Sequence, residues 1–156
     1  MITLMKLFLL THEKELHRKT NTGALAVELL GDDIEVVLWE RTKPNKKLLD
    51  FIEQKNVALL YPHEQSEMLC ETTSYDAYIL IDSTWQEAQK IYNKSPYLHD
   101  LPSVKIHTDK KSVYSLRRNQ KEYGLCTAEI VAEVLKSKFM FDQAEGLERM
   151  LDDFMG

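Results

Sequence analysis

Residues 77–85 read AYILIDSTW, an apolar run that ends in a carboxylate, two hydroxyls and an indole. Five consecutive apolar residues are typical of a strand that is buried on both faces of a sheet. Thr84 and Glu87 form a capping-box pattern, which predicts a helix that begins at Trp85 with Thr84 as its N-cap. Asp82 is therefore expected at the carboxyl end of a buried strand, where open α/β sheets usually bind ligands.

Strand and helix patterns alternate along the rest of the chain. The strand patterns cover residues 7–10, 34–39, 57–61, 78–81 and 104–107. The helix patterns cover residues 46–54, 85–94, 128–138 and 142–154. This alternation predicts an α/β fold, a three-layer sandwich around a mostly parallel sheet. A length of 156 residues fits one domain spanning 1–156.

Several classes of protein are disfavoured by the sequence. No apolar stretch is long enough to span a bilayer, so no membrane partner is expected. The apolar start continues into Glu13 and Glu15, which favours a first strand over a secretory signal. Cys70 and Cys126 form neither a disulfide framework nor a metal site, which fits a reducing cytoplasm and no bound metal. Glycine-rich nucleotide motifs and a hydrolase nucleophile elbow are also missing from the sequence.

The net charge of −5 is unevenly distributed. Residues 142–156 hold five acids against one arginine, which leaves only −1 for residues 1–141. Four cations, Arg41, Lys43, Lys46 and Lys47, follow one another without an intervening acid, and residues 105–121 hold six cations against one aspartate. Phosphate binding depends on local clusters of this kind. Solvated charge runs are equally compatible with the pattern, and both interpretations stay open.

A second loop-to-helix transition lies at residues 125–129, where Thr127 is the expected N-cap. Arg117, just ahead of it, has the planar donors that hold a carboxylate in a bidentate way. For Asp82 the alternative is support of the turn, and for Arg117 it is a solvated loop. His12 and His63 carry no chemistry that the sequence alone would assign.

Six blocks of the sequence, taken together, resemble the DTW-domain family of tRNA-uridine aminocarboxypropyltransferases. In order they are LTHEKE at 10–15, KTNTG at 19–23, LLYP at 59–62, LIDSTWQEA at 80–88, YSLR at 114–117 and LCTAE at 125–129. The resemblance covers about residues 5–137. The family is related to the SPOUT methyltransferases, which implies a knotted carboxyl-terminal part and a possible homodimer. The chain departs from many members in lacking a cysteine-rich segment before the first strand, which leaves the mode of RNA docking open.

The resemblance implies transfer of the 3-amino-3-carboxypropyl group from S-adenosylmethionine to a tRNA uridine, with methylthioadenosine as the other product. It assigns Asp82 as the general base that takes the proton of the uridine imide nitrogen; the alternative is that Asp82 only orients a substrate. A base here must be partly desolvated and reachable, so a carboxylate packed away from any cavity would count against this role. A methyltransferase using the same donor and a non-catalytic RNA-binding module are the rival functions.

The family motifs also imply a set of binding residues. The residues expected to bind S-adenosylmethionine are Leu60, Tyr61, Pro62, Thr84, Trp85, Arg117, Leu125 and Thr127. The cations expected to contact tRNA phosphates are Arg18, Lys19, Lys110, Lys111, Arg118 and Lys121.

Overall fold

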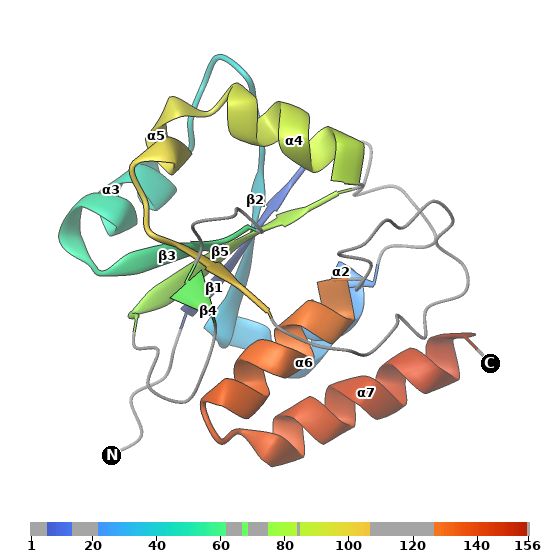
Figure 1. Ribbon diagram of the computed structural model, residues 1–156. Helices are drawn as coiled ribbons and strands as arrows, with labels where there is room; N and C mark the ends of the chain where they lie inside the picture. Colours follow the sequence, from blue (N-terminus) through green and yellow to red (C-terminus); the bar gives the residue numbers. More distant parts are fainter. Residues whose placement is uncertain are drawn as a thin grey trace.

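A computed structural model describes residues 6–13, 22–61, 67–68, 75–83, 85–106 and 127–155. The strands in this part of the chain are β1 (Lys6–Thr11), β2 (Ile34–Leu38), β3 (Val57–Leu60), β4 (Glu67–Met68), β5 (Ala77–Asp82) and β6 (Ser103–Lys105). The helices are α2 (Gly23–Leu30), η1 (Gly31–Asp33), α3 (Lys46–Gln54), α4 (Trp85–Asn93), α5 (Pro96–His99), α6 (Thr127–Ser137) and α7 (Phe141–Met155). Figure 1 shows the helices lying on both sides of the strands.

The six strands form one sheet in the order β2-β1-β5-β3-β6-β4, and every neighbouring pair is parallel. The carboxyl ends of the strands therefore share one edge. Strand β5 lies between β1 and β3. After β1 the chain continues to β2, on one side of β5, and after β3 it continues to β4, on the other side. Ligands bind preferentially at such a switch in strand order, beyond the carboxyl ends of the strands. Asp82, the last residue of β5, stands at this point of the sheet.

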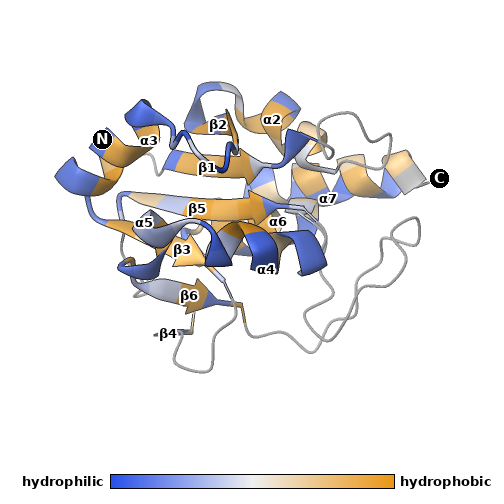
Figure 2. Ribbon diagram, turned by 90° about the horizontal axis from the view of Figure 1, so that it is seen from above, coloured by the Kyte–Doolittle hydropathy of each residue, from blue (hydrophilic) through white to orange (hydrophobic). Residues whose placement is uncertain are grey.

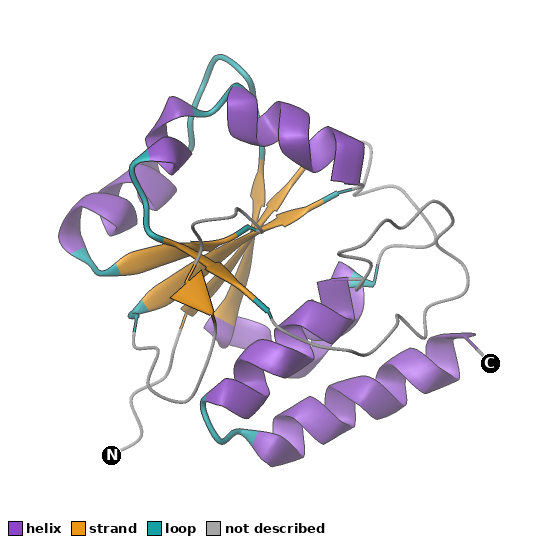
Figure 3. Cartoon of the chain, in the orientation of Figure 1, coloured by secondary structure: helices purple, strands orange, loops and turns teal. Residues whose placement is uncertain are grey.

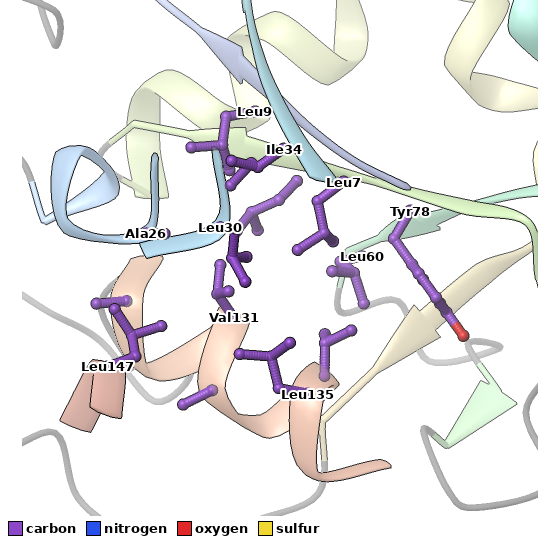
Figure 4. Packing of buried hydrophobic residues seen from close by; sticks show 14 of the residues in the cluster. Leu7, Leu9, Ala26, Leu30, Ile34, Leu60, Tyr78, Val131, Leu135 and Leu147 are labelled. Carbon is purple, nitrogen blue, oxygen red and sulfur yellow. The ribbon is translucent and has the colours of Figure 1, made fainter. Parts of the chain in front are cut away.

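Two hydrophobic cores lie on the two faces of the sheet. On one face, Leu9 and Leu80 pack with helices α2, α6 and α7, and Figure 4 shows Val131, Leu135 and Leu147 of these helices directed toward the strands. On the other face, the apolar strand residues that alternate with those of the first core pack with helices α3, α4 and α5. In Figure 2 the central strands are mostly hydrophobic. The predicted three-layer α/β architecture is confirmed, and the sheet is entirely parallel.

The expected elements compare closely with those observed. All five predicted strands are present, and α3 has the predicted bounds of residues 46–54. Helices α6 and α7 each begin one residue earlier than expected, at Thr127 and Phe141. Helices α2 and α5 and the two-residue strand β4 were not predicted from the sequence. The resemblance implies a knot in the carboxyl-terminal part, where residues 107–126 lie outside the described residues.

Helix α2 escaped prediction because its sequence is almost entirely apolar. Its sequence, GALAVELL, contains one charged residue, and the helix is covered by the sheet on one side and by α7 on the other. Its exposed residues, Ala24 and Glu28, include only one polar side chain, so the amphipathic pattern of a surface helix is weak. The spacing of its buried residues, Gly23, Ala26 and Leu30, is nevertheless helical.

Candidate active site

Buried polar side chains gather at the carboxyl edge of the two central strands. Thr11 of β1 pairs in register with Asp82 of β5. Asp82 follows Tyr78 and Leu80 at two-residue intervals, so its side chain faces the layer of α2 and α6. Thr22 directly precedes α2, and Thr127 is the first residue of α6. All four polar residues are buried. A buried group of this kind must satisfy its hydrogen bonds internally.

The Asp82 carboxylate is held by helix α6. The Thr127 hydroxyl donates a hydrogen bond of 2.6 Å to Asp82 Oδ1. Thr127 was expected to be the N-cap of a helix starting at residue 128, but it is the first residue of α6 and its hydroxyl bonds to the sheet. The amino end of α6, which is the positive end of the helix dipole, lies beside the carboxylate.

Thr22 connects the amino ends of α2 and α6. Its carbonyl oxygen accepts a hydrogen bond of 3.1 Å from the Leu25 amide, which begins α2. Its hydroxyl accepts a hydrogen bond of 3.2 Å from the amide of Ala128 in α6. The first turn of α6 is therefore capped by a residue 106 positions away in the sequence. This contact fixes the helix end that carries Thr127.

Asp82 is less accessible than expected for a residue that meets a ligand. Its exposed fraction is 1%. The desolvation that a general base would need is therefore present, whereas the open approach is not. A base must present an oxygen to its substrate, so this role requires that substrate binding uncover the carboxylate. Orientation of a substrate by the carboxylate requires the same opening, whereas support of the turn does not.

Leu60 and Tyr61 are adjacent in sequence but belong to opposite layers. Leu60 packs in the same core as Tyr78 and the α6 side chains, on the Asp82 face. The Tyr61 ring lies on the other face, where it stacks on Tyr92 of α4 at 4.5 Å between ring centroids. Burial raises the pKa of the Tyr61 hydroxyl, with a further contribution from Tyr92. Of the two, only Leu60 lines the face that contains Asp82.

The remaining predicted site residues are only partly visible. Helix α4 begins at Trp85, as the capping-box pattern predicted, but the side chain of Trp85 is outside the described part. The structure likewise gives no description of Pro62, Thr84, Arg117 and Leu125, or of the expected RNA contacts Arg18, Lys19, Lys110, Lys111, Arg118 and Lys121. Asp82, Leu60 and Thr127 are the predicted residues that the structure brings to one face.

Two further polar residues of this edge were not predicted as part of the site. Thr11 and Thr22 are 1% and 0% exposed, although threonine is mostly a surface residue. Both lie in blocks of the sequence that resemble family motifs, which was the one available signal. His12, to which no chemistry was assigned, stacks on Trp39 with a centroid distance of 5.9 Å.

We expect Thr22→Val to lower the free energy of unfolding by about 1–3 kcal/mol, because it leaves the buried Ala128 amide without its acceptor. Urea denaturation measures this loss. Thr22→Ser is the matched control, since it keeps the hydroxyl and removes only a methyl group, worth about 0.8 kcal/mol. Equal losses in the two variants would show that the hydroxyl does not stabilise α6.

The described ranges hold neither a candidate metal site nor a helix that could span a membrane. Within them, no group of three or more histidine, cysteine, aspartate or glutamate side chains could hold a metal ion. None of the helices in the same ranges combines the length and the apolar character needed to cross a bilayer.

Comparison with known proteins relates the chain to one family and to a curated relative. The family described as DTW domain matches residues 1–156. A curated relative, tRNA-uridine aminocarboxypropyltransferase 2 of Drosophila melanogaster, is 33% identical over 138 residues. That match covers 83% of this chain and 55% of the relative, so the chain spans about half of the relative's length. No solved structure matches the chain.

Proposed function

Because the chain belongs to the DTW-domain family, we propose that it transfers the 3-amino-3-carboxypropyl group of S-adenosylmethionine to a uridine of tRNA. The relative from Drosophila melanogaster bears the name of this activity. The observation that carries the proposal is the contact between Asp82 and Thr127 at the carboxyl edge of the central strand. The two residues come from two separate family blocks, at 80–88 and 125–129, and the fold joins them.

The side chains at this edge fit the proposed donor. S-adenosylmethionine is cationic at its sulfonium and amino groups, and Asp82 supplies an anion on the same face as apolar Leu60. The family motifs assign donor binding to Leu60, Tyr61, Pro62, Thr84, Trp85, Arg117, Leu125 and Thr127. Tyr61 would contribute through its main chain, because its ring is stacked on Tyr92 in the other layer. The other residues named are proposed to bind the donor as well.

The proposed reaction is a substitution at carbon. The uridine imide nitrogen loses its proton and bonds to the aminocarboxypropyl carbon, while the carbon–sulfur bond breaks and its electron pair stays on sulfur. Three carbons are attached to that sulfur, so the site must align one of them with the nitrogen and exclude the other two. Positioning of both substrates is therefore the main task of the protein.

Asp82 has one of two roles in this scheme. As a general base it would accept the imide proton, a contribution of typically 100- to 10,000-fold. As an orienting group it would hold the uridine or the donor amine through a hydrogen bond to its charged carboxylate. Both roles require the carboxylate to be uncovered when substrates bind, since Asp82 is 1% exposed.

The family relation supports several further expectations. They are a SPOUT-like knot in the carboxyl-terminal part, a single DTW domain spanning 1–156, a possible homodimer and a cytoplasmic location. Contacts with tRNA phosphates are assigned to Arg18, Lys19, Lys110, Lys111, Arg118 and Lys121.

A two-label transfer assay tests the proposed function. The protein is incubated with unmodified tRNA and S-adenosylmethionine labelled either in its methyl group or in its carboxyl group. We expect carboxyl label, and no methyl label, to become bound to tRNA. Label arriving only from the methyl group would identify a methyltransferase instead. Transfer of neither label, with tRNA still bound, would favour a binding module.

A further inference from the structure

The loop between β2 and α3, residues 39–45, is fixed at both ends. At its start, the Trp39 amide donates a hydrogen bond of 2.8 Å to the carbonyl oxygen of Thr11, and the Trp39 indole N–H donates one of 2.9 Å to the Ser95 hydroxyl. At its end, the Asn45 side chain caps α3 by accepting a hydrogen bond of 2.9 Å from the Leu48 amide. The backbone of the loop is thus anchored, so its side chains project from a defined position.

The loop and the first two residues of α3 form a segment, residues 39–47, that is rich in cations. Three of these cations have no ionic partner among the described residues. Arg41, Lys43 and Lys46 are exposed, and no ion pair joins them to any residue that the structure describes. Lys47 differs, because its ammonium group lies 2.7 Å from Glu35 Oε1 and lowers the pKa of that carboxyl. Glu40 is the one acid in residues 39–47, so the cations of this segment outnumber its acids.

The loop lies on the same edge of the sheet as the candidate active site. Leu38 at the end of β2 pairs with Thr11, and Thr11 pairs with Asp82. Neighbouring strands are about 4.8 Å apart, so the ends of β2 and β5 lie about 10 Å apart. Figure 3 shows the loop as the teal segment that rises beyond the end of β2.

We propose that Arg41, Lys43 and Lys46 form a docking surface for the phosphate backbone of tRNA, an inference that rests on the proposed function. A protein with a net charge of −5 repels RNA over most distances, so binding requires local clusters of unpaired cations. This cluster meets that requirement and follows β2, which is separated by β1 alone from the strand that ends in Asp82. Contacts of this kind position the RNA and read no base sequence.

The test compares tRNA binding by the wild type and by the triple variant Arg41→Ala/Lys43→Ala/Lys46→Ala over a range of salt concentrations. Each lost phosphate contact reduces the slope of log K against log salt by about 1. We expect the triple variant to reduce the slope by about 3 and to weaken binding about tenfold or more at low salt. Binding of S-adenosylmethionine by the variant should be unchanged, which shows that it is folded.

Single substitutions provide the matched control. Lys55 is an exposed lysine directly after α3, at the opposite edge of the sheet, and Lys55→Ala should leave both affinity and slope at the wild-type values. Lys43→Ala should reduce the slope by about 1. Wild-type binding by the triple variant would overturn the docking surface, even if the two-label assay succeeds. Equal effects of Lys43→Ala and Lys55→Ala would overturn it as well, whereas failure of label transfer concerns only the proposed function.

Discussion

Asp82→Asn is expected to lower the rate of transfer to tRNA by about 100- to 10,000-fold, the range that a positioned proton acceptor typically supplies. Asparagine has the same shape and its side-chain oxygen still accepts the hydrogen bond from Thr127, so the fold should be retained. The rate is measured in single turnovers with saturating donor and tRNA, which separates the chemical step from binding.

The pH dependence of the same variant separates the two roles of Asp82. If Asp82 is the base, raising the pH should restore part of the rate, because the uridine imide then ionises without help. If Asp82 orients a substrate, the loss should be the same at every pH. The former outcome would also show that substrate binding uncovers a carboxylate that is 1% exposed in the free protein.

Asp76→Asn is the matched control for this substitution. Asp76 directly precedes the same strand at its amino end, is exposed and accepts a hydrogen bond of 2.9 Å from the Asn56 amide. It should keep wild-type activity. If Asp82→Asn lowered the unfolding free energy in proportion to its lost activity, Asp82 would be a support of the turn and not part of the reaction.

The sequence was sufficient to place the central part of the fold. Strand β5 and the start of α4 were predictable because a continuous apolar run and a capping box are both local signals. Leu60 and Tyr61 could also have been separated by sequence, since adjacent residues of a strand face opposite sides of the sheet. Helix α2 has a weaker signal, because its sequence is almost entirely apolar and only the spacing of its buried residues is helical.

The hydrogen-bond partners of the site could not be predicted. Thr127 bonds to a residue 45 positions away, and the cap that Thr22 places on α6 spans 106 positions. Such contacts depend on how the layers are stacked, which periodicity does not encode. The burial of Asp82 is of the same kind, because one of its contacts comes from Thr127 at the start of α6.

Thr127→Val is expected to lower the transfer rate by about 10- to 150-fold, because a hydrogen bond to a charged group contributes about 1.5–3 kcal/mol. Valine has nearly the shape of threonine but offers Asp82 no donor, so the carboxylate loses a bond of 2.6 Å in a buried position. The unfolding free energy should fall by about 1–3 kcal/mol for the same reason. Thr127→Ser keeps the hydroxyl and should retain most of the activity.

A double-mutant cycle decides whether Thr127 acts through Asp82. In the Asp82→Asn background the hydroxyl no longer serves a charged group, so Thr127→Val should add much less than its effect in the wild type. Fully additive losses would contradict this coupling and assign Thr127 an independent contact with a substrate. A large loss of activity in Thr127→Ser would point the same way, since its hydroxyl can still reach Asp82. Coupling confined to Asp82 and Thr127 would instead mean that α6 contributes to the reaction by setting the position of one carboxylate at the end of β5.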